Sequence, residues 1–372
     1  MMRNQANRDG KVLRALGEDV ELMGEVFGLR ELVEDYAPTV DRQTAEAVQT
    51  NVRRFIELHG DLPLNQIGPP HLREFIDAVA KLPKVQSSAS QRKMDFLEMI
   101  ADAKRRKLEL VGFMTRRRAF DMMKSLMAHG VSRGFVANNV WTASKLKAPK
   151  AKFSKAKPRR PFKAEEARRV LIHIKTSNHP QFARETIDRW APWIAAYHGL
   201  RIQEASQLKV ADFALRDGVQ ALQITDAGEG QRAKTQSTVR WVPLHPRLIE
   251  EGLLDLVEER RASGEDVFVL RYWHRYRKRI VDLEEDSRGR VSGAYSKRFA
   301  SLLDRLSLSD PGLVFHSWRH RLQDVADTVG IPESHRRYLT GRANKNAAEG
   351  AYGEGAALGA LLESLSKLDP LA

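Results

Sequence analysis

The sequence contains no cysteine in its 372 residues. This absence excludes disulfide bonds, zinc sites built from cysteine and catalysis by a thiol. No run of apolar residues is long enough to cross a bilayer as a helix, and residues 1–8 lack the apolar segment of a signal peptide. We therefore expect no membrane association and no export signal. The composition is compatible with a reducing cytoplasm.

The charge of the chain is strongly basic. Lysine and arginine number 62 against 48 acidic residues, which gives a formal net charge of +14 at pH 7. Such a surplus favours a polyanionic partner, because neutralising phosphates releases condensed counterions. A generic basic protein has the same balance, so charge alone assigns no function. A chain of 372 residues is long enough for two or more domains.

The first part of the chain has the periodicity of a small helical domain. Residues 1–40 are mixed and charged, and we interpret them as an N-terminal arm or short helices. Over residues 41–143 apolar side chains recur at helical spacing. Helices are predicted from Arg42 to a stop at Gly60, over 70–82, over 91–104, and from a capping residue, Thr115, to Gly130.

Residues 144–161 form a lysine-rich segment with alanine, serine and proline, which cannot build a core. We expect an extended linker here. It is either a solvated hinge or a hinge that also follows DNA phosphates, because every second or third residue is positively charged. The basic residues concerned are Lys145, Lys147, Lys150, Lys152, Lys155, Lys157, Arg159 and Arg160.

Residues 162–355 have the pattern of a mixed domain that is mostly helical. The apolar stripe over 187–197 is interpreted as core. Helices are predicted over 163–174 and from Pro246, Ser296 and His316, and strands over 222–225 and 239–244. The expected fold class is therefore mainly α with a small antiparallel β-sheet (α+β).

Five residues in this domain supply the chemistry needed to break and rejoin a DNA phosphodiester without a metal. That reaction needs a nucleophile, fixed cations on the nonbridging oxygens and an acid for the leaving oxygen. The guanidinium fork of arginine matches two phosphate oxygens. A phenol has a pKa of about 10 and needs cationic surroundings or a base to attack at neutral pH. The five residues are Arg201, Lys234, His316, Arg319 and Tyr352.

In order and spacing these residues resemble the tyrosine recombinase, or phage integrase, family. The segment Gly-Leu-Arg-Ile-Gln-Glu at 199–204 is similar to the first box of that family, and His-x-x-Arg at 316–319 is similar to its second. A tyrosine follows in Gly-Ala-Tyr-Gly at 350–353. The resemblance is strong over 160–355 and weak over 40–140. It implies a helical core-binding domain followed by a catalytic domain of the DNA breaking-rejoining type.

The resemblance implies that Tyr352 is the nucleophile and forms a 3′-phosphotyrosyl link with DNA. The bond energy stays in that link, so no ATP, other cofactor or metal is expected. Tyr338 is closer to the His-x-x-Arg step, but it fits a packed helix end, and we prefer Tyr352.

Arg201 and Arg319 are the implied phosphate clamp. Glu204 lies three residues after Arg201, on the same face of a helix, and is expected to orient it. His316 is the implied proton-handling residue. If a helix starts there, its side chain points into the same cleft as that of Arg319.

Two positions of the implied site leave alternatives open. Lys234 matches the family's hairpin lysine, the general acid, with Arg232 as a nearby competitor. Arg342 stands after a Thr-Gly pair, where the family commonly has a histidine or tryptophan after Leu-Gly. Arg342 either donates to the phosphate or stacks there, or it marks reduced activity or a shift of one residue in the alignment.

Two further segments remain open to more than one interpretation. Residues 271–279 interleave aromatic and basic side chains, which suits nucleic-acid contact or an ordinary basic helix face. Residues 356–372 predict a helix with a leucine stripe, which docks either on a neighbouring protomer or on its own domain. The candidate DNA contacts outside the linker are Arg116, Arg117, Arg275 and Arg277.

The function implied by the resemblance is a site-specific DNA recombinase that integrates or excises a mobile element. The implied partners are double-stranded DNA at a specific recombination site, further copies of the chain in a homotetramer on paired sites, and DNA-bending accessory proteins. The expected location is the cytoplasm, in association with the nucleoid. Two alternatives are a type IB topoisomerase-like enzyme and a catalytically weak DNA-binding relative.

Overall fold

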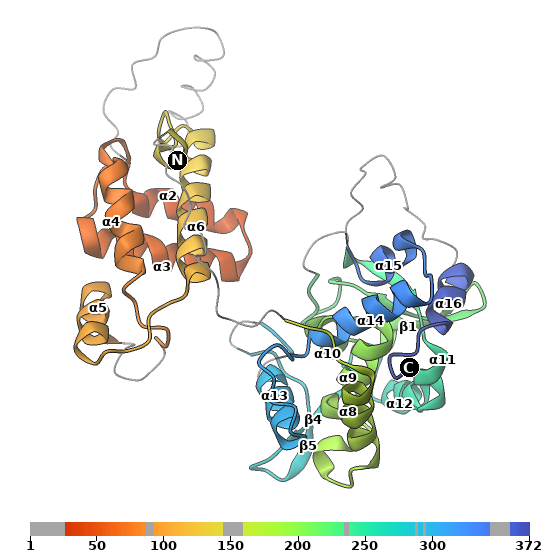
Figure 1. Ribbon diagram of the computed structural model, residues 1–372. Helices are drawn as coiled ribbons and strands as arrows, with labels where there is room; N and C mark the ends of the chain where they lie inside the picture. The colour runs from red at the N-terminus through yellow and green to blue at the C-terminus, as the bar shows by residue number, and fades with distance from the viewer. Residues whose placement is uncertain are drawn as a thin grey trace, which may run out of the picture. The chain divides into compact units, whose positions relative to one another are not determined.

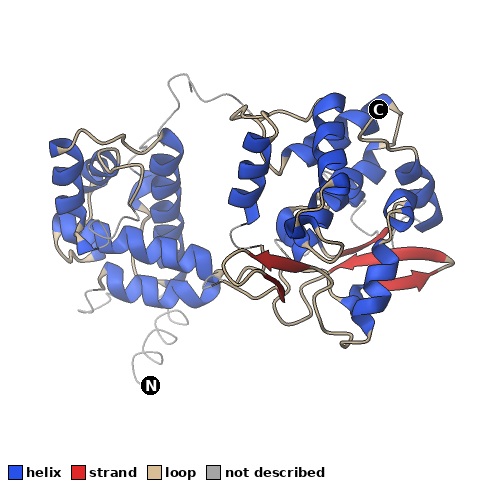
Figure 2. Cartoon of the chain, turned by 90° about the horizontal axis from the view of Figure 1, so that it is seen from below, coloured by secondary structure: helices blue, strands red, loops and turns tan. Residues whose placement is uncertain are grey.

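The structure, a computed structural model, describes residues 27–86, 93–143, 159–233, 238–286, 289–292, 295–342 and 358–372. The chain divides into two compact units, residues 1–155 and 156–372 (Figure 1). The boundary falls within the basic segment 144–161. The strands drawn in Figure 2 belong to the second unit, whereas the first unit is drawn with helices and loops.

The first unit is a bundle of helices. α3 (Arg42–His59) begins at Asp41, whose carboxylate accepts a hydrogen bond from the Thr44 backbone nitrogen at 3.1 Å, and it ends at Gly60. These bounds confirm the prediction. The other elements are α2 (Leu29–Tyr36), η1 (Ala37–Thr39), η2 (Leu64–Gln66), α4 (Pro69–Val79), α5 (Phe96–Arg105), α6 (Phe113–Arg133) and α7 (Val140–Ala143).

Both predicted ends of α6 were wrong. The helix begins before Thr115 and runs through Gly130, and it ends at Gly134, which has a left-handed φ of 79°. Gly130 is required for packing rather than for termination, because a Cβ there would lie 3.1 Å from a methyl group of Leu32. From the sequence alone, a glycine is compatible with the end of a helix or with a close contact to another helix. Only the residue packed against it shows which applies.

The core of the first unit joins the apolar faces of these helices. Phe55, Phe75 and Phe96 are fully buried, and the ring centroids of Phe55 and Phe75 lie 5.4 Å apart. The helix predicted over 91–104 begins later, because Asp95 caps it. That start places Phe96 in the core.

The second unit packs helices around a small antiparallel sheet of order β1-β2-β3, formed by β1 (Phe213–Arg216), β2 (Val219–Ile224) and β3 (Arg240–Pro243). Leu222 of β2 lies opposite Phe213 and Val242, and all three are buried. The mainly α fold with a small antiparallel sheet is therefore confirmed. The other elements are α8 (Ala164–Thr176), η4 (Pro180–Phe182), α9 (Ile187–His198), α10 (Ile202–Ser206), η5 (Val210–Asp212), α11 (Pro246–Glu250), α12 (Leu253–Arg261), α13 (Tyr295–Arg305), α14 (Ser317–Thr328), α15 (Glu333–Leu339) and α16 (Leu358–Ser366).

Helix α9 forms the centre of this unit. Its residues from Trp190 to His198 are all buried, and α14 packs along it. The helix ends at Gly199, whose φ of 66° lies in the left-handed region that glycine adopts readily. A Cβ at this position would lie 3.3 Å from the side chain of Thr340. Gly199 therefore lets the end of α9 approach the segment that follows α15.

A second hairpin occupies the basic and aromatic segment. β4 (Arg271–His274) pairs antiparallel with β5 (Arg279–Asp282), with Trp273 opposite Ile280. The turn between them includes Lys278, whose φ is 49°. The basic helix face, which was one interpretation of 271–279, was therefore wrong. Alternation over only four residues is too short to distinguish a strand from a helix by period alone.

The C-terminal helix α16 packs on the domain that precedes it in the same chain. Leu361 and Leu365 are fully buried, and the helix contacts β2, β3 and α15. Nε2 of His245 donates to the carbonyl oxygen of Leu368 at 3.1 Å. The packing within the chain is therefore present in this structure, and docking on a neighbouring protomer stays a prediction. Among the described residues, no helix combines the length and the apolar character needed to cross a membrane.

Candidate active site

Arg201 is held at the start of α10 by its own helix. Its backbone nitrogen donates to Oε2 of Glu204 at 2.9 Å, and its guanidinium contacts Oε1 of the same carboxylate. Arg201 can make both contacts because α9 ends at His198 and α10 begins at Ile202, which leaves Arg201 as the residue before the first turn of α10. Glu204 is buried and accepts from both the backbone and the side chain of Arg201; that it orients Arg201 for catalysis stays a prediction.

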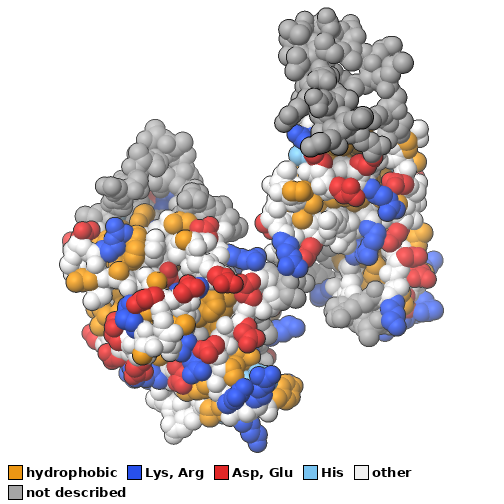
Figure 3. Space-filling view, turned by 180° about the vertical axis from the view of Figure 1, so that it is seen from behind, with side chains coloured by type: hydrophobic (Ala, Val, Ile, Leu, Met, Phe, Trp, Pro, Cys, Tyr) orange, Lys and Arg blue, Asp and Glu red, His pale blue; other side chains and the backbone are white. Residues whose placement is uncertain are grey.

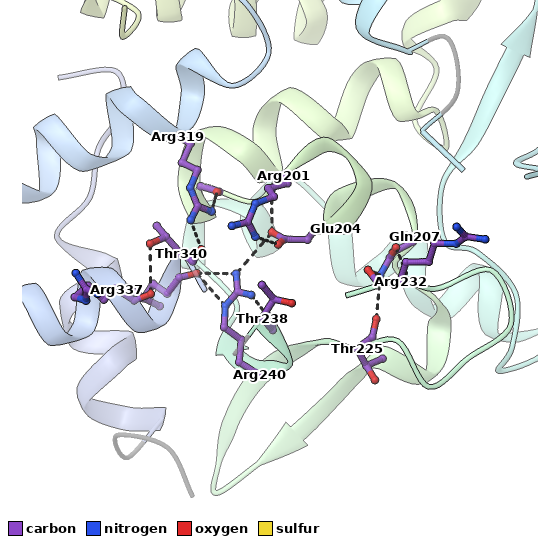
Figure 4. A network of polar contacts seen from close by, with 12 residues as sticks. Arg201, Glu204, Gln207, Thr225, Arg232, Thr238, Arg240, Arg319, Arg337 and Thr340 are labelled. Carbon is purple, nitrogen blue, oxygen red and sulfur yellow. Dashed lines mark hydrogen bonds and ion pairs between the residues drawn. The ribbon is translucent and has the colours of Figure 1, made fainter. Parts of the chain in front are cut away.

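Arg319 reaches the same place from α14. Its Nη1 donates to the carbonyl oxygen of Gly199 at 2.9 Å, and its Nη2 contacts the carbonyl oxygen of Thr340 (Figure 4). Arg319 and Gly199 are 120 positions apart in the sequence. The side chain thus joins the end of α9 to the segment after α15, and it is almost fully buried.

Arg240 joins Arg201 and Arg319 in a cluster of three arginines around Glu204, and the sequence did not predict it. From β3 its Nε and Nη2 donate to the carbonyl oxygen of Leu339 at 3.2 and 3.0 Å, and its Nη1 donates to that of Thr238 at 2.7 Å. Its Nη2 also lies 3.8 Å from Oε2 of Glu204. A signal was present, because Arg240 precedes Val242 by two residues and so shares the buried face of the strand.

The cluster carries an excess of positive charge. Three guanidinium groups, those of Arg201, Arg240 and Arg319, surround the one carboxylate of Glu204. Burial, then the neighbouring charge of Arg201, lowers the pKa of Arg319 to about 9. Burial alone would raise the pKa of Glu204, but Arg240 and Arg201 outweigh it and hold that pKa below its usual value. An additional anion would relieve this imbalance.

His316 stands at the N-terminal end of α14, three residues before Arg319. Burial, with the neighbouring charges of His320, Arg319 and Arg159, lowers the pKa of His316 to about 4. The imidazole is therefore neutral at pH 7 in this state, so one ring nitrogen donates and the other accepts. Its ring centroid lies 5.1 Å from that of His320.

A cavity of about 400 Å³ opens beside these groups. Arg159, Arg201 and His316 line it, together with one face of α13 that includes Ser296 and Phe299. Apolar side chains, among them Leu313 and Phe315, form most of the remaining wall. The two arginines are the charged groups in the cavity that a phosphate could contact. The structure therefore places Arg201, Arg319, His316 and Glu204 close together, and their roles in catalysis stay predictions.

Lys234 and Tyr352 lie outside the described residues, but both flanks of the segment that carries Lys234 are anchored. The Nε2 of Gln207 donates to the carbonyl oxygens of Thr225 and Arg232, at 3.0 and 3.1 Å, and its Oε1 accepts from the Arg232 nitrogen at 3.1 Å (Figure 4). On the other flank, Arg240 holds the carbonyl oxygen of Thr238. Gln207 directly follows α10, the helix that Arg201 precedes. Its side chain therefore links Thr225 and Arg232 to the end of that helix.

If the chain cleaves DNA as its resemblance to the recombinases implies, a Gln207→Met variant should do so about ten- to a hundredfold more slowly, because a displacement of 1 Å in a catalytic group has effects of that order. DNA affinity should stay unchanged, since the side chain of Gln207 bonds to Thr225 and Arg232 within the protein. The measurement is a single-turnover cleavage rate beside a binding isotherm. Gln220→Met, at the other end of β2, is the matched control. A normal rate in the Gln207 variant would show that this anchoring is not needed for catalysis.

The predicted DNA contacts differ in whether acidic side chains already neutralise their charge. Arg159 is exposed beside the cavity, whereas Arg160 donates to Glu166 through Nη1 and Nη2, at 2.7 Å each, and to Asp310 through Nε at 2.8 Å. The bond to Glu166 above all raises the pKa of Arg160. Arg160 therefore fixes the end of the linker to the second unit. The linker residues Lys145, Lys147, Lys150, Lys152, Lys155 and Lys157 lie outside the described residues.

The remaining candidates lie on three other elements. On α6, Arg116 is half-buried and Arg117 pairs with Asp121 at 2.8 Å. Arg275 and Arg277 are exposed in the turn between β4 and β5. Arg342 is exposed just after α15, and its charge contributes to the lowered pKa of Arg319. Arg342 therefore lies in the electrostatic field of the cluster.

Known proteins match this chain in structure only. No protein-family model matches the sequence, and no curated protein does. A lambda integrase dimer bound to a COC′ core site has a TM-score of 0.52 at 16% identity, covering 88% of this chain and 77% of that one. The Tn1549 transposon integrase in complex with transposon right end DNA has a TM-score of 0.54 at 14% identity, covering 89% and 96%. A lambda integrase tetramer bound to a Holliday junction has a TM-score of 0.51 at 14% identity, covering 86% and 79%. At these identities the likeness establishes the fold, which is that of the integrases.

Proposed function

We propose that this chain is a tyrosine-type site-specific DNA recombinase, which cuts and rejoins DNA through a 3′-phosphotyrosyl intermediate. The observation that carries the proposal is the cluster of Arg201, Arg319 and His316 beside one cavity, in a fold shared with integrases. These residues come from two segments far apart in the sequence. Burying more guanidinium groups than carboxylates does not favour folding, whereas a bound phosphate would balance their charge.

In the proposed reaction the phenolic oxygen of Tyr352 attacks the phosphorus, and the bond from phosphorus to the 5′ oxygen breaks. Arg201 and Arg319 absorb the charge that develops on the nonbridging oxygens. Lys234 gives its proton to the leaving 5′ oxygen, and His316 takes the proton of the phenol. A negative phosphodiester in the cavity would raise the pKa of His316 from about 4 toward neutrality, which suits proton exchange. The reverse steps join a second strand.

The described tyrosines of the second unit support Tyr352 indirectly. Burial raises the pKa values of Tyr338 and Tyr295, and that of Tyr197 to about 12. A raised pKa disfavours the phenolate, so these three are poor nucleophiles. Tyr272 and Tyr276 belong to the β4–β5 hairpin and line a different cavity.

The proposed partners follow from the same likeness. Lambda integrase is known as a dimer on a core site and as a tetramer on a Holliday junction. We extend to this chain a double-stranded recombination site, a homotetramer on paired sites and accessory DNA-bending proteins. The setting we propose is integration or excision of a mobile element within the nucleoid. We also propose that Arg159, which is exposed beside the cavity, and the linker lysines contact phosphates, because the sequence places a positive charge at every second or third residue there.

The test of this function is covalent trapping on a nicked duplex that carries the recombination site. Cleavage next to the nick releases a short fragment, so the phosphotyrosyl adduct accumulates and migrates with the protein in a denaturing gel. Exchange between two differently labelled duplexes then separates a recombinase from a type IB topoisomerase, which relaxes a single duplex. Binding without any adduct, on a library of candidate sites, would leave the chain a DNA-binding relative and would overturn the proposal.

A further inference from the structure

A second and larger cavity lies in the β4–β5 hairpin region, away from the cation cluster. It has a volume of about 850 Å³, near the upper end of the range of about 300–1,000 Å³ that is usual for ligand sites. The hairpin forms one wall, α13 forms another, and His179 and Gln181 of the η4 region complete it. At the end of the second unit where Figure 1 places this hairpin, Figure 3 shows basic and hydrophobic side chains together.

The charge of this cavity is positive throughout. Five lysine or arginine residues and two histidines line it, with no acidic residue among the described side chains of its wall. Arg298 is partly neutralised by Asp188, at 3.2 Å. Among the described residues, no ion pair uses Lys278 or Lys297. Two lysines at the cavity therefore keep their full charge for an anionic ligand.

Three aromatic side chains lie among these cations. Tyr276 at the tip of the hairpin is 77% exposed, and the guanidinium of Arg275 sits 4.5 Å from its ring centroid. Tyr272 packs against the core, with Arg298 at 5.7 Å from its ring, and Trp273 is half-buried. Exposed rings that neighbour cations form the platform on which unpaired bases stack. In an intact duplex the bases stack on each other, so the platform suits unpaired nucleotides.

The position of this cavity relative to the candidate active site is set by one helix. Ser296 and Phe299 of α13 line the cavity that contains Arg201 and His316, whereas Lys297, Arg298 and Ser301 line the hairpin cavity. Since helical residues alternate faces with a period of 3.6, the two cavities lie on different sides of α13. A helix with its side chains is only about 10–12 Å across, and a DNA strand of a few nucleotides can pass over it.

We propose that the β4–β5 hairpin and α13 form a binding site for unpaired DNA, which holds nucleotides of a strand that has left the duplex near the cleavage site. The bases stack on Tyr276 and Trp273, and Lys278 and Lys297 contact the phosphates. This proposal rests on the proposed function for the source of the unpaired strand. The site is separate from the residues that carry out cleavage.

The experiment uses the full-length chain and a short fluorescein-labelled oligothymidylate, with binding followed by fluorescence anisotropy. Tyr276→Ala should weaken binding about tenfold, as expected for the loss of one stacked base. The double variant Lys278→Ala/Lys297→Ala should weaken binding and reduce the salt slope of log affinity by about 1.4, since each phosphate contact to a single strand contributes about 0.7. The matched control is Lys175→Ala/Lys367→Ala, which removes the same charge from other surfaces.

Each outcome of these measurements supports or overturns the proposed site for unpaired DNA. Undiminished oligothymidylate binding by the Tyr276 and lysine variants overturns the proposal, and so does an equal loss in the control. A proportionate loss of binding to an unnicked duplex would instead identify a duplex phosphate contact and overturn the assignment to unpaired DNA. Covalent trapping on the nicked duplex runs in parallel. If trapping succeeds while the hairpin variants bind normally, only this proposal fails; if the hairpin binds as expected without trapping, only the recombinase function fails.

Discussion

A Tyr352→Phe variant is expected to bind the recombination site as tightly as the parent and to form no covalent adduct with a nicked duplex. Phenylalanine keeps the ring but lacks the oxygen that attacks phosphorus, so the first transesterification cannot occur. The loss should reach the detection limit of a denaturing gel. Arg201 and Arg319, the proposed phosphate-binding cations, are untouched by the change.

Tyr338→Phe is the matched control for this experiment. Tyr338 is closer in sequence to the His-x-x-Arg step, but it packs against the core of the second unit and burial raises its pKa. A phenol in that position is harder to ionise, and we expect the Tyr338 variant to form the adduct at close to the parental rate. An adduct formed by the Tyr352 variant but lost in the Tyr338 variant would move the nucleophile to α15.

The residues that sequence reasoning found share one property: each belongs to a short local pattern. Arg201 lies between the Gly199 stop of α9 and Glu204, whose carboxylate accepts from both its backbone nitrogen and its guanidinium, so these contacts lie within six residues of sequence. His316 and Arg319 are one helical turn apart, which predicts a common face. The mainly helical fold with a small sheet follows from hydrophobic periods in the same way.

Arg240 and the β4–β5 hairpin were missed for different reasons. Strand alternation places Arg240 on the buried face, but it does not show what its guanidinium would bind there. An arginine in a strand is normally solvated, and only the carbonyl oxygens of Leu339 and Thr238 explain its burial here. No local rule predicts that Leu339, 99 positions away, supplies an acceptor. The hairpin is hidden for another reason, because its strands are short and its composition is basic.

An Arg240→Met variant should lose about 3–5 kcal/mol of unfolding free energy, the range found when one partner of a buried ion pair is removed. Its side chain is 2% exposed, and its loss leaves two carbonyl oxygens without their donor and Glu204 with one cation fewer. Denaturation followed by tryptophan fluorescence measures this, since five of the six tryptophans lie in the second unit: Trp190, Trp193, Trp241, Trp273 and Trp318, against Trp141 in the first. Arg184→Met, at an exposed ion pair with Glu259 in the same unit, is the control and should cost less than about 1 kcal/mol.

Whether Arg240 acts through its charge on Glu204 can be tested with a double variant and with pH. In the Arg240→Met background, Glu204→Gln should cost less than it does in the parent, because it removes a carboxylate that has lost a partner. The deficit should also shrink on acidification. In the parent the lowered pKa of Glu204 adds stability above its unfolded value of about 4.5, and that stability is lost as pH falls through the folded pKa. Without Arg240, one of the two cations that lower the pKa of Glu204 is gone, so that pKa moves up toward its unfolded value and the variant loses less stability than the parent as pH falls. Additive costs for the two substitutions, with a deficit that does not change with pH, would show that Arg240 acts through its carbonyl acceptors alone and that the arginine cluster is not electrostatically coupled.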